Sequence, residues 1–327
     1  MTGLDLPARE DLYRRHGNFA LAFSATYQPG LSYFGDERGF IAYRRVGGST
    51  LVLSNPMAPP EMWADLIDGL VAQMGDVSFW QVSRRMAVLL ADRGCRVNAI
   101  GVETSIDLGA YDFKGPKKRS FRTAANRMSA NGLQTREVLA SEINAEQLEA
   151  ISVKWRQTRA VKSRELTFLI RPVVLGNEKG VRKFFTFDAG NIPVAFASFD
   201  PLYEDGTLTG YLMATKRWMP EADPLVGYEL IRCAIETFQR EGLGVLLFGL
   251  SPFAQVKDKD FNHSRSVKQA LHFIRDNRVF NRYIYPIAGL NKHKASYMGV
   301  SETSYCTFNR RPGLLRLIRM SRACGIL

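Results

Sequence analysis

Residues 114–132, KGPKKRSFRTAANRMSANG, separate two halves of the chain and carry six Lys or Arg residues without an acid. The stretch predicts a helix, because Pro116 suits a first helical turn and Asn131-Gly132 suits a left-handed stop. At about 100° per residue, apolar residues gather on one side of this helix and basic or amide residues on an adjoining side. The apolar side consists of Phe121, Ala124, Ala125 and Met128, and the polar side of Lys118, Arg119, Arg122 and Asn126.

The polar side of this helix has two interpretations. It is either an ordinary solvated face or a surface that holds an anionic partner. Surface helices usually mix Glu with Lys, and this helix has no acid, which favours the partner. The whole chain has a formal charge of +12 and a pI near 9.6. Such a surface attracts nucleic acid, anionic lipid or nucleotide phosphates without choosing between them.

The bulk composition is that of a globular protein with one large domain or two. The chain has 327 residues, of which 46% are hydrophobic and 23% charged. The longest apolar runs, such as GVLLFGL at 244–250, fall far short of the roughly 18 residues that a membrane span needs. The first residues, MTGLDLPAREDLYRRHG, mix acids with bases and contain no apolar core of a signal peptide. We therefore expect a cytoplasmic location.

Motifs that mark common enzyme classes are missing from the sequence. The cysteines form no CxxC pair and the histidines form no HExxH, which predicts free thiols and no metal site. The chain also has no GxSxG, no Walker loop and no strand-linked GxGxxG. The sequence therefore gives no reason to assign the protein to the hydrolases, kinases or dehydrogenases that carry these motifs.

The order of predicted elements is similar in the two halves. In the first half, helices are expected over 7–24, 62–74 and 84–93, and strands over 34–56 (a hairpin turning at Gly47-Gly48), 77–82 and 99–108. In the second half, helices are expected over 143–159, 227–242 and 264–277. Three strands are expected within 183–215, split at Gly190-Asn191 and Asp205-Gly206, and further strands over 245–253, 283–294 and 304–311. The pattern predicts a mixed α/β (α+β) fold of two lobes with mainly antiparallel sheets. We expect an N-terminal lobe at 1–113, a basic connecting helix at 114–132 and a C-terminal catalytic lobe at 133–327.

Five blocks of the sequence resemble a known family. The element order of each half resembles the GNAT fold of N-acyltransferases. The blocks themselves resemble, in order, the C-terminal aminoacyltransferase domain of phosphatidylglycerol lysyltransferases, also called lysylphosphatidylglycerol synthases. They are GFIAYRRVGGSTLVLSNPMAPP (39–60), IGVETSIDL (100–108), KGPKKRSFRTAANRMSANG (114–132), LFGLSPF (247–253) and YPIAGLNKHKASYMGVSETSY (285–305). The resemblance implies two tandem GNAT-like lobes.

The resemblance also implies an activity. The family moves an aminoacyl group from aminoacyl-tRNA to a hydroxyl or amine acceptor, either a phosphatidylglycerol-type lipid or a small molecule of a biosynthetic pathway. Aminoacyl-tRNA is then a co-substrate, and we expect no cofactor. Because an aminoacyl ester is already activated, the enzyme has to align two substrates and stabilise an oxyanion. The basic helix would hold phosphates of the tRNA or of the acceptor.

The resemblance carries over to particular residues. Lys294 matches a conserved lysine of the family and is expected to contact the terminal phosphate of the tRNA or the oxyanion. On the expected strand, Lys292 shares its face and His293 lies between the two lysines. Ser296 stands where the family usually has a basic residue. Arg122, with Lys118, Arg119 and Asn126, is expected to bind phosphate or a headgroup.

The chain departs from the family at one further motif. Lipid-modifying members often have Asp-Leu-Met-Arg in the sheet, whereas this chain has Tyr211-Leu212-Met213-Ala214. Arg217 would replace the missing arginine, and Glu229 would bind the donor amino group or accept a proton. Glu229 is also a residue type that the start of a helix favours. Ser251 would hydrogen-bond the donor, or it simply belongs to a Ser-Pro turn.

The C-terminal segment 310–327, RRPGLLRLIRMSRACGIL, interleaves apolar residues with arginines. This is typical of a helix that lies on an anionic membrane, which predicts peripheral contact with the inner membrane surface. Packing back onto the protein is the alternative.

Two other functions remain open at the level of sequence. An acyl-CoA-dependent N-acyltransferase should show a glycine-rich pyrophosphate loop before a helix, and KRWMPEADPLVG at 216–227 has a single glycine. A non-catalytic RNA- or membrane-binding relative would explain the altered motif at 211–214.

Overall fold

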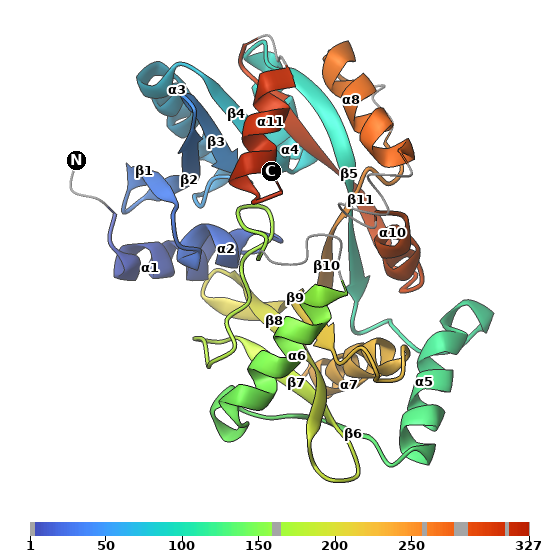
Figure 1. Ribbon diagram of the computed structural model, residues 1–327. Helices are drawn as coiled ribbons and strands as arrows, with labels where there is room; N and C mark the ends of the chain where they lie inside the picture. The colour runs from blue at the N-terminus through green and yellow to red at the C-terminus, as the bar shows by residue number, and fades with distance from the viewer. Residues whose placement is uncertain (1–3, 159–164, 257–259, 278–286, 311–313, 327) are drawn as a thin grey trace.

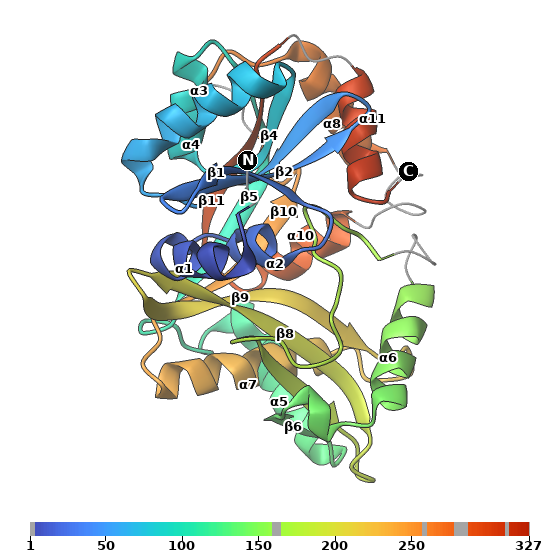
Figure 2. The ribbon, with the colours of Figure 1, turned by 90° about the vertical axis from the view of Figure 1, so that its left-hand side faces the viewer.

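A computed structural model describes residues 4–158, 165–256, 260–277, 287–310 and 314–326. Its strands form one 11-stranded sheet in the order β1-β2-β3-β4-β11-β5-β10-β9-β8-β7-β6 (Figures 1 and 2). The strands are β1 Ser32–Asp36, β2 Gly39–Val46, β3 Ser49–Leu53, β4 Val77–Val82, β5 Arg96–Asp107, β6 Gln134–Glu137, β7 Arg182–Phe187, β8 Pro193–Glu204, β9 Thr207–Trp218, β10 Val245–Pro252 and β11 Val300–Phe308. The helices are α1 Leu6–His16, α2 Ala22–Tyr27, α3 Trp63–Met74, α4 Arg84–Asp92, α5 Arg119–Ala130, α6 Ala145–Gln157, α7 Val226–Arg240, α8 Arg265–Asp276, α10 Ile287–Ala295 and α11 Leu314–Ala323.

The hairpin predicted at Gly47-Gly48 is confirmed. Val46 pairs with Ser49, so the two glycines form the whole turn. Both have positive φ, 55° and 82°, as a two-residue turn of this twist requires. The turn therefore fixes the register of β2 against β3.

The first half of the chain buries apolar side chains on both faces of its part of the sheet. One face is covered by α3 and α4, which contribute Leu70 and Leu90 to a core with Phe79. The other face is covered by α1, α2, α8 and α11, where Tyr13 and Leu271 are among the core residues. The expected α/β lobe is confirmed, although two of its covering helices come from the end of the chain.

The second half is a five-stranded region covered by α7 on one face and α6 on the other. Leu230 and Phe238 of α7 pack with Phe121 and Met128 of α5 in one core. Leu148 of α6 belongs to a separate core on the other face. The basic helix α5 therefore packs on α7 through the apolar side that its periodicity predicted.

Strand β11 lies elsewhere than the sequence suggested. We expected it to complete the sheet of the second half, but it pairs antiparallel with both β4 and β5. Its side chains explain the position, because Tyr305 enters one core of the first half and Cys306 and Phe308 enter the other. The domain boundaries at 113 and 133 stay a prediction.

The strand expected over 283–294 is wrong for the part that the structure describes. Residues Ile287–Ala295 form helix α10 instead. Its last turn carries Lys292, His293 and Lys294, and cations at this end are favoured by the helix dipole. On a helix these three side chains point about 100° apart, so Lys292 and Lys294 do not share a face. Lys292 is exposed and Lys294 is buried.

The C-terminal helix α11 packs back onto the protein. Met320 and Ala323 are buried against the first half of the sheet, and Arg316 forms a buried ion pair with Asp76. Leu315 remains exposed on the outer side. Among the described helices, none is both long and apolar enough to cross a membrane.

Candidate active site

Strands β9 and β10 pair over a short length and then part. They run parallel from Gly210 to Leu212 and from Val245 to Leu247. Beyond this point β9 stays paired with β8, while β10 continues along β5 after an irregularity between Leu247 and Leu250. Helix α10 lies at this opening (Figure 1). Its side chains form hydrogen bonds to residues of both strands.

The side of α10 that faces β10 carries a buried lysine. Lys294 is 6% exposed, and its Nζ donates a hydrogen bond of 2.6 Å to the carbonyl oxygen of Leu250. Asn291 Nδ2 likewise donates to the carbonyl oxygen of Pro252 at 3.0 Å. Burial lowers the pKa of Lys294 from 10.5 to about 7, and the attraction of Glu103 opposes this shift. Lys294 is therefore a group that exchanges a proton near neutral pH.

Glu103 is the carboxyl group coupled to Lys294. It lies on β5, opposite Leu250 on β10 and Glu302 on β11. Burial raises its pKa, while the nearby polar side chain of Gln81 and the charge of Lys294 lower it. The net direction is upward, so the burial of this pair shifts both members toward their neutral forms.

The side of α10 that faces β9 carries a histidine between two donors. Lys216 Nζ lies 2.5 Å from His293 Nε2, and Tyr297 Oη lies 2.7 Å from the same nitrogen. The pKa of His293 falls to about 3, first because it is buried and then because Lys216 and Lys294 are positive. The ring is therefore neutral, and its Nε2 accepts hydrogen bonds from Lys216 and Tyr297.

Aromatic rings connect this cluster with the basic helix α5. The Tyr228 ring lies 4.8 Å from His293, and Phe121 of α5 lies 5.2 Å from Tyr228 and 5.8 Å from Tyr297. Tyr111 Oη also donates to the backbone oxygen of Tyr297 at 2.9 Å. The start of the basic helix and α10 therefore meet around one group of packed rings.

The structure places two of the predicted basic side chains on the loop before α5. Lys118 Nζ donates to the backbone oxygen of Asp112 at 2.6 Å and lies 3.8 Å above the Tyr111 ring. Arg122 Nη1 donates to the backbone oxygens of Phe113 and Gly115 at 2.6 and 2.8 Å. Their side chains hold this loop, while Arg119 and Asn126 are exposed along the helix.

Arg217 and Tyr211 lie in packed surroundings on β9. Arg217 is buried and its guanidinium binds Ser152 Oγ at 2.5 Å and both carboxylate oxygens of Glu165 at 2.8 and 2.6 Å. Tyr211 is buried and stacks on Phe238 at 4.6 Å. The partners in these contacts belong to other parts of the protein than α10.

Glu229 and Ser251 are also buried. Glu229, in the first turn of α7, forms a two-pronged ion pair with Arg232 at 2.7 and 2.9 Å. Ser251 lies on β10 opposite Val102, next to the Leu250 carbonyl that binds Lys294. Of the predicted residues, the structure brings His293, Lys294 and Ser251 to the α10 site.

Sequence reasoning missed Lys216, Tyr297 and Glu103. Lys216 adjoins Arg217, and strand alternation places their side chains on opposite faces. Tyr297 follows His293 by four residues, a spacing that puts two side chains on one face of a helix. Tyr297 lies in the turn after α10 and outside the strand expected over 283–294, so neither pattern pointed to it.

The comparisons with known proteins agree with this architecture. The model of the family "Phosphatidylglycerol lysyltransferase, C-terminal" matches residues 9–308. A phosphatidylglycerol lysyltransferase of Staphylococcus haemolyticus is 22% identical over 321 residues, which are 92% of this chain and 36% of that protein. One of Staphylococcus aureus is 24% identical over 277 residues, or 80% of this chain and 30% of that protein. The chain thus spans about a third of the length of these curated relatives.

Solved structures share the fold. L-PGS from Bacillus licheniformis superposes with a TM-score of 0.81 at 19% identity, covering 99% of this chain and 98% of the other. The C-terminal domain of a putative lysylphosphatidylglycerol synthetase from Agrobacterium fabrum gives 0.78 at 19% identity, with 98% of each chain covered. FemX gives 0.56 at 11% identity, covering 97% of this chain and 98% of the other. The two-lobed fold therefore extends over nearly the whole chain.

Proposed function

The chain belongs to the family of C-terminal domains of phosphatidylglycerol lysyltransferases, and on this premise we propose that it is an aminoacyltransferase that uses aminoacyl-tRNA as its donor. The observation that supports this proposal is the position of α10 at the opening between β9 and β10. There it presents a lysine with a pKa near 7 on one side and a neutral histidine on the other.

The reaction needs one bond to form and one to break at the ester carbonyl. The acceptor oxygen or nitrogen attacks the carbonyl carbon and loses its proton, and the carbonyl oxygen becomes an oxyanion. The ester bond to the terminal ribose then breaks, and the ribose oxygen takes up a proton. Lys294 would donate a hydrogen bond to the oxyanion from its ammonium form, and its pKa near 7 suits it to pass the proton on.

The second cluster would position the substrates. Lys216 and Tyr297 hold the neutral ring of His293 in one orientation by donating to its Nε2. Glu229 would bind the amino group of the transferred residue, which requires it to exchange its bond to Arg232. During such an exchange Arg232 would keep its second partner, Glu236, and the incoming ammonium would replace the guanidinium at Glu229.

The basic helix would hold phosphates of the tRNA. Arg119 and Asn126 are exposed on α5, and Lys118 and Arg122 order the loop in front of it. Phosphate contacts of this kind position a nucleic acid without reading its sequence. The packed rings between α5 and α10 would then set the distance between the bound phosphates and the reacting ester.

The acceptor is a phosphatidylglycerol-type lipid or a small hydroxyl or amine compound. For a lipid acceptor, we propose peripheral contact with the inner membrane surface through residues 310–327. Leu315 and Ile318 are exposed on the outer side of α11, and Arg322 is exposed close to them. A helix with this arrangement binds an anionic interface by apolar burial and charge together.

The experiment is a transfer assay. The protein is incubated with tRNA charged with labelled amino acids, phosphatidylglycerol vesicles and cell extract, and label is followed into the organic and aqueous phases. Transfer that RNase abolishes is the expected result. Lys294→Met should lower it strongly, whereas Lys154→Met, an exposed lysine on α6, should leave it unchanged.

Two outcomes would contradict the proposal. Label that moves only from acyl-CoA would identify an acyl-CoA-dependent N-acyltransferase. Binding of RNA or vesicles without any transfer, under conditions where charged tRNA stays intact, would identify a non-catalytic relative.

A further inference from the structure

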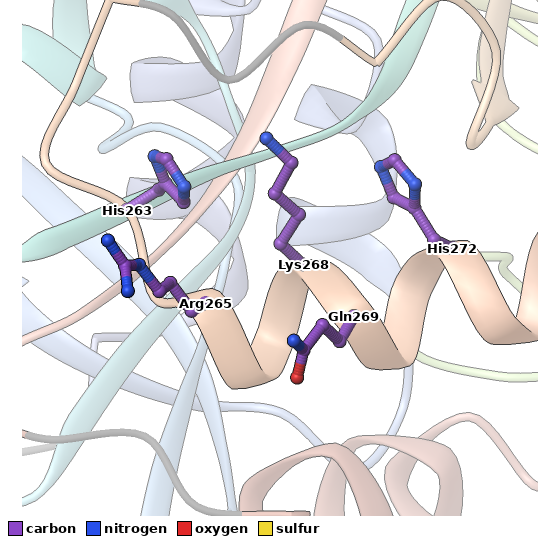
Figure 3. A pocket seen from close by; sticks show the side chains of 5 residues that line it. All are labelled: His263, Arg265, Lys268, Gln269 and His272. Atoms are coloured by element: carbon purple, nitrogen blue, oxygen red, sulfur yellow. The ribbon is translucent and has the colours of Figure 1, made fainter.

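A cationic pocket lies on α8, outside the α10 site. It has a volume of about 450 Å³ and is lined by His263, Arg265, Lys268, Gln269 and His272 (Figure 3). The side chain of Lys268 extends between the two imidazole rings, which come from the loop before α8 and from its third turn. No acidic side chain is among the described residues that line it. A concave surface with this lining suits a phosphate group and its neighbouring sugar.

The charges at this pocket are unfavourable for the helix itself. Arg265 is the first residue of α8 and Lys268 follows one turn later, while the first turn contains no acid. Cations at the N-terminus of a helix oppose its dipole. His272 Nε2 is also buried without a hydrogen-bond partner among the described residues. An anion in the pocket would be favoured by the positive end of the helix dipole and by Arg265, and it would accept a hydrogen bond from His272 Nε2.

Helix α8 lies on the same side of the molecule as two other helices that carry basic residues. In Figure 1, α8, α10 and α5 follow one another from top to bottom along the right-hand side, and Figure 2 shows them behind the sheet. Among their described side chains, α10 and α5 contribute Lys and Arg without Asp or Glu. The acid of α8, Asp276, is paired with Arg275. A single lipid headgroup cannot contact three helices, whereas a folded RNA can.

An exposed aromatic residue extends this face of α8. Phe273 is 68% exposed and follows Gln269 by one turn. An exposed aromatic ring next to cations is typical of surfaces that stack unpaired bases. We propose that the α8 pocket is a second RNA-binding site that holds a phosphate of the tRNA body, apart from the site that holds its reactive end. This inference rests on the proposed function.

The test measures binding of uncharged bulk tRNA by fluorescence anisotropy. The variant is Arg265→Ala with Lys268→Ala, and both changes favour the helix because alanine has the highest propensity and the removed charges oppose the dipole. The charge-matched control is Arg45→Ala with Arg85→Ala. Both of these residues are exposed, and Arg85 lies on α4, on the other face of the sheet.

The pocket variant should bind tRNA about 30-fold more weakly at roughly 0.15 M salt, because counterion release contributes about fivefold for each phosphate contact. The slope of log K against log salt should also fall by about 2. The single variant Lys268→Arg, in which Arg265 is unchanged, should keep most of the wild-type affinity for tRNA. The control should change Kd less than about twofold, since screening weakens charges more than about 8 Å away.

Three results would overturn the inference. One is a pocket variant that binds tRNA as the control does while wild-type transfer activity is intact, which leaves the proposed function standing. Another is weaker binding to phosphatidylglycerol vesicles with unchanged tRNA binding, which would assign the pocket to lipid. A wild-type protein that neither binds tRNA nor transfers label would end both proposals.

Discussion

Replacing Lys294 by methionine should make the protein more stable at low pH. Burial lowers the pKa of Lys294 to about 7 from its usual 10.5, so the native state binds a proton less readily than the unfolded chain. Between these two values the unfolded chain holds a proton that the native state has lost. The free energy of unfolding of the wild type therefore rises with pH across this window, and below it the charged lysine destabilises the fold.

The magnitude follows from the two pKa values. With 1.36 kcal/mol for each pKa unit, the wild type should gain about 2–3 kcal/mol between pH 6 and pH 9 relative to Lys294→Met. The variant loses the hydrogen bond to the Leu250 carbonyl, which costs about 1 kcal/mol at every pH and does not affect this difference. At pH 6 the variant should be the more stable protein.

The assay is urea unfolding of both proteins at pH 6, 7, 8 and 9, followed by far-UV circular dichroism. The quantity of interest is the difference in unfolding free energy between the two proteins at each pH, because titrating groups that do not interact with Lys294 cancel in it. Methionine is close to lysine in volume, so packing changes little. Parallel pH profiles over this range would refute the reasoning, since they would mean that Lys294 titrates alike in both states.

Glu103→Gln provides the control for this measurement. The charge of Glu103 raises the pKa of Lys294, so its removal should lower that pKa below 7. The gain in stability should then extend to lower pH in the Glu103→Gln background. If the window stays where it was, the two groups are not coupled and the account of the pair is wrong.

Three further variants test other contacts. Arg171→Met leaves the buried carboxylate of Asp200 without its cation and should cost about 3–5 kcal/mol in urea unfolding; a loss below about 1 kcal/mol would contradict the assignment. Tyr297→Phe should cost about 1 kcal/mol and slow transfer, because His293 Nε2 loses one donor; an unchanged transfer rate would remove Tyr297 from the site. Lys216→Met should raise the pKa of His293 from about 3 in an NMR titration, though burial keeps it below 6.5; an unmoved value would show that the ammonium has no influence.

Local chemistry made much of the fold predictable. The two glycines of the β2–β3 turn, the alternation of the strands and the apolar stripe of α5 each determine a local structure that the rest of the protein preserves. The position of β11 was not predictable in this way. Its pairing with β4 and β5 depends on which cores accept Tyr305 and Phe308, and a strand's own residues do not specify its neighbours.

The site was predictable in part for a related reason. The segment 283–294 is rich in aromatic and β-branched residues, so propensity favoured a strand, while the basic last turn of α10 is the signal of a helix end. Tertiary contacts decided the outcome, because Lys294 and Asn291 bind the carbonyl groups of Leu250 and Pro252, which lie beyond the part of β10 that pairs with β9. Lys216 is accessible to α10 only because β9 and β10 part, which no local pattern encodes.

Two buried pairs of a basic and an acidic residue differ in how burial and charge attraction combine to shift the pKa of the basic residue. Burial lowers the pKa of Arg171, but the attraction of Asp200 and Glu178 outweighs it and the net shift is upward, so the guanidinium stays charged. For Lys294 and Glu103, burial dominates on both sides and shifts each toward its neutral form. An arginine that stays charged at all ordinary pH values is suited to holding a buried carboxylate in place and not to transferring a proton. A buried lysine whose pKa falls to about 7 lowers stability below that pH, and such a cost is expected where a reaction uses the proton.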